Sequence, residues 1–517
     1  MPTLLRIVHN TYRDSVSLMQ LSARIAGLAG VRQASVVMAT EGNLALLREA
    51  GLLEGEVQAS PSDLLVLAQG DGEEAARAAL DEAERGLAGG AAGGPRRAPQ
   101  ESAPRSIRMA LQARPDANLA LISTPGEYAA AEALKALRLG LNVMVFSDNV
   151  SVADEVLLKR EAEARGLLVM GPDCGTSIIA GVPLGFANAV RRGPIGVVGA
   201  SGTGLQQVTS LIDQAGLGVS HALGTGGRDL KADVGGATML RAIDELAADP
   251  GTRVIVLVSK PPAAAVAERV LARANASGKP VIACFLGAAA ADVERGGVRA
   301  AATLEQAAAM AVAAARGERY SAGITRLPQF TAPRLAPGQR YLRGLYSGGT
   351  FCYEATLLLS QTLEDVHSNT PVGGATALAD VWHSRGHTLI DLGDDEFTRG
   401  RPHPMIDHRL RNERLVREAA DAQVAVILLD VVLGYGAHPD PAAEMLPALR
   451  AARATAQRGE REIAFVGFVC GTERDPQGYE RQSAALAQAG VILAGSNAQA
   501  ARIAASIALH HAEPARS

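Results

Sequence analysis

Short apolar runs alternate with amphipathic stretches along the first 90 residues of the chain. Runs with the length of buried strands fall at 4–8, 31–38 and 64–67. Apolar positions recur at helical spacing in 15–28, 43–50 and 73–87. This strand–helix order predicts a small open α/β sheet of ferredoxin-like type.

Continuous apolar runs then recur between residues 107 and 320, separated by helix-like sequence such as 128–139. They fall at 119–123, 143–146, 167–170, 195–198, 254–259 and 281–285. Strands that are apolar throughout are typical of a parallel sheet covered by helices on both faces. Because the pattern restarts at Gly193 and Pro194, we divide this stretch near residue 192 into a Rossmann-like unit and a flavodoxin-like unit.

Two stretches rich in proline and small residues have no apolar periodicity and predict linkers. They are residues 86–106, which end the N-terminal domain, and residues 327–339, which precede the last part of the chain. The resulting boundaries are 1–88 for an N-terminal α/β domain, 89–106 for a flexible linker, 107–192 and 193–320 for two middle domains, 321–339 for a second linker, and 340–517 for the last domain.

The last domain repeats motifs of the unit that begins at residue 193. GVVGASGTG at 196–204, ALGTGGRDL at 222–230 and VIVLVSKPP at 254–262 correspond in order to GLYSGGT at 344–350, LIDLGDDEFTRG at 389–400 and AVILLDVVLGYG at 425–436. Three correspondences in one order indicate two related modules. We expect them to pack as a pseudo-dimer with their loops facing each other.

Composition narrows the class of protein. Hydrophobic residues make up 48% and charged residues 20%, which is typical of globular domains, and the net charge of -4 gives no broad attraction for nucleic acid or anionic lipid. No run approaches the roughly 18 apolar residues of a membrane span. The four cysteines lie far apart without metal-ligand spacing. We therefore expect no metal site, no nucleic-acid or membrane partner, and a cytoplasmic protein with reduced thiols.

Both modules contain a glycine-rich turn that follows a buried strand and opens a helix. The turns are Ser201, Gly202, Thr203 and Gly204 in the first module, and Ser347, Gly348, Gly349 and Thr350 in the second. Hydroxyls beside the free N–H groups of a helix N-terminus bind anions, so two such turns can hold one phosphate. The alternative is that each turn only makes a tight connection.

Nucleotide binding is disfavoured at these turns. The chain lacks the GK[ST] lysine of a nucleotide P-loop, and the strand expected at 219–223 ends without the acidic residue of a dinucleotide site.

A second constellation lies at residues 399–407. Arg399, Arg401 and His403 sit in a loop stiffened by two prolines, which holds a guanidinium near an imidazole. Arginine binds carboxylate or phosphate through two hydrogen bonds, and histidine transfers protons near neutral pH. A surface ion-pair loop is the alternative.

Further polar residues follow or end strand-like runs, where open α/β sheets assemble ligand sites. They are Asp173, Cys174, Gly175, Arg228 and Arg474. No base accompanies Cys174 in the sequence, so a buried small side chain is favoured over a nucleophile.

Several of these motifs resemble a known family. Residues 118–312, with MGPDCGTSIIAGVPLGFA, GVVGASGTG and GTGGRDL, resemble the succinyl-CoA synthetase alpha subunit, and residues 341–505 resemble the ligase-type domain of its beta partner. YRDSVSLM, LISTPGEYAA, VMVFSDNV, GRPHPMID, LLDVVLGYG and GTERDP are similar to the FdrA family over nearly the full length. The resemblance implies an α/β fold with a Rossmann-like CoA-binding-type domain at 107–192 and flavodoxin-like succinyl-CoA-synthetase-type domains at 193–320 and 340–517.

The chain departs from the thiokinases in three ways. The segment corresponding to their phosphate-accepting histidine, residues 287–307, contains no histidine. Their opening CoA-binding glycine turn is missing, and no ATP-grasp domain is visible. Acyl-CoA synthetase activity and CoA as cofactor are therefore disfavoured.

FdrA-like proteins are implicated in allantoin catabolism as a component of oxamate carbamoyltransferase, which converts oxalurate and phosphate to oxamate and carbamoyl phosphate. The resemblance implies such a subunit, oligomeric and working with companion carbamoyltransferase subunits on a small ureido acid. Phosphate and carbamoyl phosphate would be its substrate and product, and no cofactor is assigned.

In this reaction we expect the two glycine turns to hold phosphate. Arg228 or Arg401 would bind the carboxylate or the developing oxyanion, and His403 would protonate the departing nitrogen. Asp173, Cys174, Gly175, Arg399 and Arg474 would bind substrate. The alternatives are a component of an NDP-forming acyl-CoA synthetase, a carbamoyltransferase for another ureido acid, and a non-catalytic scaffold.

Overall fold

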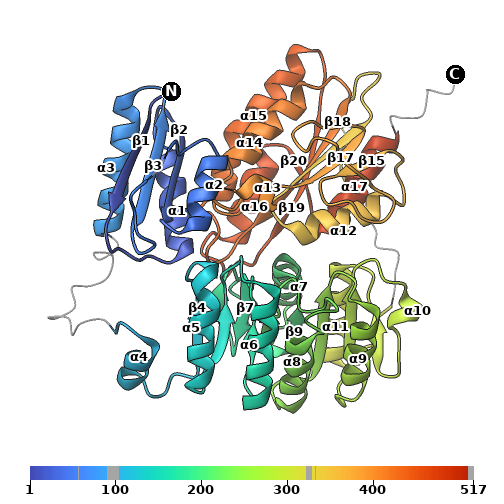
Figure 1. Ribbon diagram of the computed structural model, residues 1–517. Coiled ribbons are helices and arrows are strands. Elements are labelled where there is room, and N and C mark those ends of the chain that lie inside the picture. Colours follow the sequence, from blue (N-terminus) through green and yellow to red (C-terminus); the bar gives the residue numbers. More distant parts are fainter. Residues whose placement is uncertain (56, 90–103, 322–328, 332, 400, 511–517) are drawn as a thin grey trace.

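The computed structural model describes residues 1–55, 57–89, 104–321, 329–331, 333–399 and 401–510. A small N-terminal domain lies beside a larger body made of a lower and an upper half (Figure 1). The first predicted linker, 89–106, lies outside the described residues except at its two ends, and so does much of the second, 321–339. Among the described residues, no helix has the length and apolar character needed to cross a membrane.

The N-terminal domain has the six elements that its hydrophobic pattern predicts. They are β1 (Thr3–Val8), α1 (Ser15–Ala26), β2 (Val31–Met38), α2 (Glu41–Glu49), β3 (Leu64–Gly70) and α3 (Glu73–Gly89). The sheet has the order β1-β3-β2, and β3 is antiparallel to both neighbours. Asp14 and Thr40 cap α1 and α2 through their side chains, which fixes where these helices begin.

The second unit is a three-stranded parallel sheet with the order β4-β5-β6. Its elements are α4 (Ile107–Ala113), β4 (Leu119–Ile122), α5 (Gly126–Arg138), β5 (Asn142–Val145), α6 (Val152–Arg165) and β6 (Val169–Met170). The hairpin of β7 (Thr176–Ile179) and β8 (Val182–Gly185) follows, with Ala180 and Gly181 at positive φ in its turn.

This hairpin joins the sheet of the next unit, because β7 pairs antiparallel with β10. By its strand pairing, the hairpin belongs to the sheet that follows the predicted boundary at residue 192, although both of its strands precede that residue. Local sequence patterns do not reveal which sheet a short hairpin joins.

The first of the two related modules forms the rest of the lower half in Figure 1. Its elements are β9 (Arg192–Gly199), α7 (Gly202–Gln214), β10 (Val219–Gly224), α8 (Ala237–Ala248), β11 (Val254–Ser259), α9 (Ala264–Asn275), β12 (Val281–Phe285), α10 (Ala290–Val293), β13 (Val298–Ala300) and α11 (Leu304–Arg316). The sheet has the order β13-β12-β11-β9-β10-β7-β8. All six residues of β11 are buried, as expected of a strand covered on both faces.

The second module forms the upper half. Its elements are β14 (Tyr341–Tyr346), α12 (Gly349–Leu359), β15 (Val366–Ser368), β16 (Thr376–Ala377), β17 (His387–Asp391), α13 (Asp395–Thr398), α14 (Arg409–Ala420), β18 (Val424–Val432), α15 (Pro441–Arg458), β19 (Ala464–Cys470), α16 (Tyr479–Gln488), β20 (Val491–Ala494) and α17 (Asn497–His510). The sheet has the order β16-β15-β17-β14-β18-β19-β20. Its five strands β17-β14-β18-β19-β20 repeat the order β10-β9-β11-β12-β13 of the first module. The outer strands differ, because β15 is parallel to β17 whereas β7 is antiparallel to β10.

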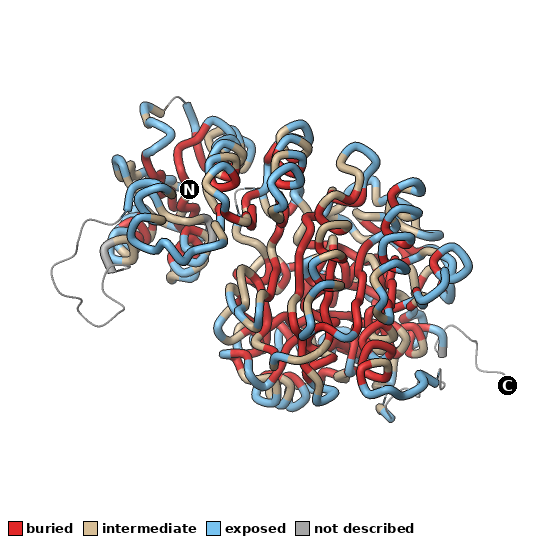
Figure 2. The backbone as a smooth tube through the Cα atoms, turned by 90° about the horizontal axis from the view of Figure 1, so that it is seen from below, coloured by how far each residue is buried: buried red, intermediate tan, exposed pale blue. Residues whose placement is uncertain are grey.

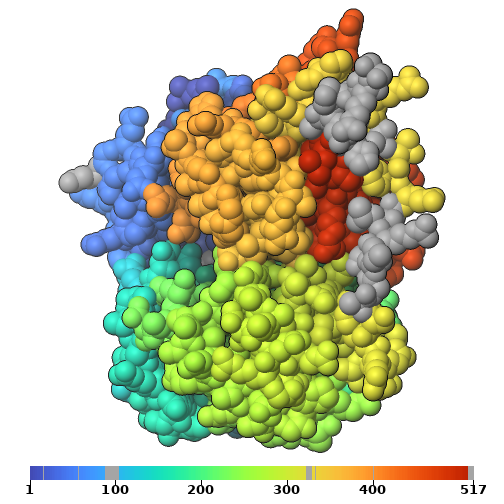
Figure 3. Space-filling model, turned by 90° about the vertical axis from the view of Figure 1, so that its right-hand side faces the viewer, coloured from blue at the N-terminus to red at the C-terminus, as the bar shows by residue number. Residues whose placement is uncertain are grey.

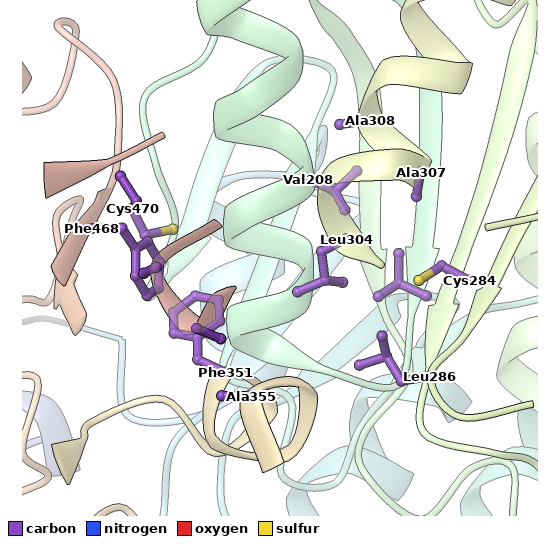
Figure 4. Close-up of a cluster of buried hydrophobic side chains, with 14 of the residues drawn as sticks. Val208, Cys284, Leu286, Leu304, Ala307, Ala308, Phe351, Ala355, Phe468 and Cys470 are labelled. Atoms are coloured by element: carbon purple, nitrogen blue, oxygen red, sulfur yellow. The ribbon is translucent and has the colours of Figure 1, made fainter. Parts of the chain in front are cut away.

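The two modules share one hydrophobic core at their junction. Seen from below, buried backbone fills the centre of the larger body and exposed segments surround it (Figure 2). The two halves meet along a broad seam on the surface (Figure 3). One buried cluster contains Val208 of α7, Leu304 of α11, Phe351 of α12 and Phe468 of β19, and the close-up in Figure 4 shows α7 between the side chains of the two modules. The first helix of each module therefore lies at the junction.

The N-terminal domain packs onto the second module and approaches its junction with the first. Arg409 of α14 donates a hydrogen bond to the carbonyl of Ala26, at 2.5 Å. Met19 of α1 packs against the shared core. Residues of the N-terminal domain are therefore close to the loops at the carboxyl ends of the module strands.

Candidate functional site

The N-termini of α7 and α12 meet at the junction of the modules. Ser201 is the N-cap of α7, and its Oγ accepts a hydrogen bond from the Gly204 N–H at 2.9 Å. The same Oγ lies 2.6 Å from Oγ1 of Thr350, which is in the first turn of α12. A Cβ on Gly348 would lie only 3.0 Å from Cγ2 of Thr203, so glycine permits this close approach.

A cavity of about 390 Å³ opens beside the two helix ends. Its walls come from the first module, the second module, the loops after β5 and β6, and Met19 of the N-terminal domain. Of the eight residues predicted to bind phosphate, all except Gly204 and Gly348 line it. The structure thus brings together the two turns that the sequence singles out.

The second turn already holds an internal carboxylate. The buried side chain of Asp430 accepts hydrogen bonds from the N–H groups of Ser347 and Gly348, each at 2.8 Å. Arg411 donates to Asp430 at 3.0 Å and to Oγ of Ser347 at 2.8 Å. These two N–H groups are therefore occupied, and the contribution of this turn to a ligand falls to Gly349 and Thr350.

A second acid lies against the start of α12. A Cβ on Gly349 would be 2.5 Å from Oδ2 of Asp391, while Oδ1 accepts from the N–H of Gly393 at 2.9 Å. Burial raises the pKa of Asp391 to about 7, although the charge of Lys260 opposes the shift. Asp391 therefore titrates near neutral pH, next to the helix end.

Among the described residues that line the cavity, Lys260 is the only basic residue of lysine or arginine type. It directly follows β11, and its Nζ lies 5.0 Å from the centroid of the Tyr353 ring. Lys260 is not among the site residues predicted from the sequence. Its position in SKPP, at the carboxyl end of a buried strand, was the signal that could have found it.

His403 lines the cavity as a neutral imidazole. Burial lowers its pKa to about 4, its Nδ1 accepts from the N–H of Met405 at 3.2 Å, and its ring lies 6.0 Å from that of Phe186. With Nδ1 as acceptor, the proton of the neutral ring is on Nε2. At neutral pH this arrangement favours hydrogen-bond donation over the expected proton transfer from an imidazolium.

Three further predicted residues, Asp173, Cys174 and Gly175, also line the cavity. Burial raises the pKa of Asp173 to about 6, with a further contribution from the charge of Asp148. Burial raises the pKa of the Cys174 thiol to about 11, and this thiol donates to the carbonyl of Thr176. Cys174 is therefore a protonated, buried side chain at neutral pH, as its sequence context favours.

The predicted arginines are not among the residues that line the cavity. Arg228 donates to Glu155 Oε2 at 3.0 Å and to the carbonyl of Val150 at 2.8 Å. The other three are exposed. Arg401 has its guanidinium carbon 6.0 Å from the centroid of Trp382, Arg399 lies 3.6 Å from Glu49, and Arg474 lies 3.8 Å from Asp213. Each faces an acid or ring on a neighbouring element, which adjacency in the sequence could not reveal.

Comparison with family models matches three parts of the chain. Residues 1–104 match the AllF, heavy metal-associated domain, residues 190–287 match the CoA binding domain, and residues 345–507 match the CoA-ligase domain. Residues 1–104 contain no cysteine, and the described part of this domain contains no group of three His, Cys, Asp or Glu side chains that could hold a metal ion. Its residues therefore do not fit a bound heavy metal.

One relative extends over nearly the whole chain. The uncharacterized protein YahF of Escherichia coli (strain K12), an FdrA-like protein, is 46% identical over 493 residues, which are 94% of this chain and 95% of YahF. The chain belongs to the FdrA family. Within this FdrA chain, the two glycine turns fall in the parts matched by the CoA binding and CoA-ligase models.

Other similarities of the FdrA chain are more distant. The succinate–CoA ligase [ADP-forming] subunit alpha-2 of Trichomonas vaginalis is 32% identical over 192 residues, which are 36% of the FdrA chain and 61% of that subunit. The structure of an acetyl-coenzyme A synthetase of Ca. Korarchaeum cryptofilum in complex with phosphate and ADP covers 76% of the FdrA chain and 82% of its own, with 15% identity and a TM-score of 0.32. The FdrA chain thus spans under two thirds of the succinate–CoA ligase subunit.

Proposed function

We propose that this chain is a subunit of a carbamoyltransferase that uses phosphate to convert oxalurate to oxamate and carbamoyl phosphate. The observation that carries the proposal is the meeting of two helix N-termini at one cavity, with Ser201 and Thr350 hydroxyls 2.6 Å apart. The match of residues 1–104 to the AllF domain model supports the family resemblance from which this reaction is inferred.

Phosphate fits between these helix ends. The N–H groups of Gly202 and Thr203 open α7 and have no partner within the helix, and the partial positive charge of the helix N-terminus attracts an anion. Across the cavity, Thr350 adds a hydroxyl and Lys260 adds a positive charge. Because Asp430 occupies the N–H groups of Ser347 and Gly348, α7 supplies most of the backbone contacts.

The reaction balances with phosphate and oxalurate alone. An oxygen of hydrogenphosphate forms a bond to the carbamoyl carbon, the bond from that carbon to the oxamate nitrogen breaks, and the phosphate proton goes to this nitrogen. The site would accelerate transfer by holding both reactants in contact. His403 would donate a hydrogen bond from Nε2 to the developing oxyanion, which its low pKa permits.

The test is carbamoyl phosphate formation from oxalurate and phosphate, with the chain alone and with its companion subunits. We expect activity in the assembled complex and its loss when Ser201 and Thr350 are both replaced. An active complex that keeps its rate with both residues replaced would make the chain a scaffold. An intact complex without any activity on oxalurate would overturn the proposed reaction.

A second candidate is a component of an acyl-CoA ligase. The matches to the CoA binding and CoA-ligase models favour it, and the absence of histidine from residues 287–307 opposes it. CoA-dependent formation of ADP by the assembled complex distinguishes this candidate from carbamoyl transfer.

A further inference from the structure

The carboxyl of Asp173 lies at the cavity without a hydrogen-bond donor among the described residues. Asp173 follows β6, lines the cavity and is exposed. Its Oδ2 lies 3.7 Å from where a Cβ on Gly227 would be, and Gly227 also lines the cavity. Asp148, the other acid among the described lining residues, has a hydrogen bond with the side chain of Asn149. Asp173 therefore has both carboxylate oxygens available to a ligand.

The backbone fixes the point from which this side chain projects. Asp173 has a φ of 55°, in the left-handed region where aspartate and asparagine are enriched among residues other than glycine. Its N–H donates to the carbonyl of Ser147 at 2.9 Å, and the N–H of Cys174 donates to the carbonyl of Val145 at 3.1 Å. These two hydrogen bonds tie the loop to the end of β5, so Asp173 is part of a well-defined cavity wall.

The cavity has a positive and a negative part. The N-terminus of α7 and the ammonium group of Lys260 attract an anion. The largest charge effects on Asp173 come from three acidic side chains and one basic side chain, namely Asp148, Glu155, Asp395 and Arg228. The charge of Lys260 acts instead on Asp391. A ligand that fits both parts carries an anion at one end and N–H groups at the other.

The two parts lie close enough together for one small ligand. A Cβ on Gly202, the first residue of α7, would be 3.3 Å from Oγ1 of Thr176. Thr176 is three residues beyond Asp173, and three residues span at most roughly 10 Å. A group attached to a phosphate at the start of α7 therefore comes within reach of the Asp173 carboxyl.

We propose that Asp173 selects the carbamoyl group by accepting a hydrogen bond from its NH2. The inference rests on the proposed carbamoyl transfer, and it assigns recognition of the nitrogen of carbamoyl phosphate to one side chain. Desolvation by the surrounding protein raises the pKa of Asp173 to about 6, so the carboxyl is ionised at pH 7.5 and offers acceptors only. A methyl group in place of the NH2 has no hydrogen to donate to it.

The probes are carbamoyl phosphate and acetyl phosphate, which differ by NH2 in place of CH3. Binding of each to the full chain is measured by calorimetry at low temperature and pH 7.5. We expect the unmodified chain to prefer carbamoyl phosphate by about 10- to 100-fold, the contribution of one hydrogen bond to a charged group. The preference should decrease as the pH falls through the pKa of Asp173, because a protonated carboxyl forms only a neutral hydrogen bond.

Two substitutions remove the charge of Asp173 and tolerate its backbone conformation. Asp173→Asn keeps the shape of the side chain and should reduce the preference to less than about tenfold, whereas Asp173→Gly should abolish it. Both should strengthen the binding of acetyl phosphate and inorganic phosphate, because a negative charge near the anion is lost. Weaker binding of all three ligands would indicate a structural role and overturn the inference.

Asp395→Asn is the matched control. It removes the same charge from an exposed acid that acts on Asp173 but is not among the described residues that line the cavity. The preference should stay unchanged. The inference is also overturned if the unmodified chain binds neither acyl phosphate or binds both equally, or if Asp173→Gly keeps the preference.

These titrations need neither turnover nor companion subunits. An intact complex without carbamoyl transfer activity would overturn the proposed reaction and leave a measured preference for carbamoyl phosphate in place. Equal binding of the two acyl phosphates by a chain whose complex is active would overturn only the role of Asp173.

Discussion

Replacing Thr350 by valine removes one of the two hydroxyls that join the helix N-termini and preserves the shape of the side chain. The lost contact is the 2.6 Å hydrogen bond between Oγ1 of Thr350 and Oγ of Ser201. Ser201 retains the hydrogen bond from the Gly204 N–H, so the N-cap of α7 stays in place. The substitution therefore acts on the junction and on the cavity without uncapping the helix.

We expect Thr350→Val to have a smaller effect on the free energy of unfolding than on the binding of phosphate. One hydrogen bond between neutral groups contributes about 0.5–1.5 kcal/mol to folding, so Thr350→Val should lower the free energy of unfolding by about 1 kcal/mol. A hydrogen bond to a charged ligand contributes about 1.5–3 kcal/mol. Because 1.4 kcal/mol corresponds to a factor of ten, phosphate should bind the variant about 10- to 150-fold more weakly.

The assay combines denaturant unfolding with calorimetric titration of phosphate into the full chain. Thr356→Val is the control, because Thr356 is fully buried on the same helix and its hydroxyl donates to the Cys352 carbonyl at 2.7 Å, away from the cavity. We expect a similar loss of stability there with unchanged phosphate affinity. Equal phosphate affinity in the two variants would refute the placement of phosphate at the helix ends.

Two further substitutions test the site, and a third tests a buried carboxyl of the fold. Lys260→Met should weaken phosphate binding about tenfold and reduce its salt dependence, measured by titration at two ionic strengths; an unchanged salt dependence would exclude Lys260 as an anion contact. Arg401→Ala should change kcat/KM of the assembled complex less than about threefold, because Arg401 is exposed outside the cavity, whereas a direct oxyanion contact would give about a 100- to 1000-fold loss. Burial raises the pKa of Glu354 from 4.5 to about 7, so this carboxyl stabilises the fold below pH 4.5 and loses that contribution as the pH rises through 7. Between pH 5 and 8 the unfolding free energy of the unmodified chain should therefore fall by up to about 3 kcal/mol relative to Glu354→Gln, and parallel pH profiles would contradict the shift.

Local pattern was sufficient for much of the fold. The apolar runs at 31–38 and 254–259 are strands with these same bounds, and the glycine turns at Ser201 and Ser347 do open helices after buried strands. The sequence correspondence of the two modules reappears as the same order of five parallel strands in both sheets. Such features depend on side chains close in sequence, where the periods of helix and strand act directly.

The sequence by itself determined the elements, the repeat and the two helix ends that form the candidate site. Only the tertiary structure decided which groups are free to act there. Asp430 takes the N–H groups of Ser347 and Gly348 from 83 and 82 residues away, and Ser201 meets Thr350 across 149 residues. Hydrogen-bond partners distant in sequence are determined by packing and burial. The periodicity of hydrophobic residues within one segment carries no information about such partners.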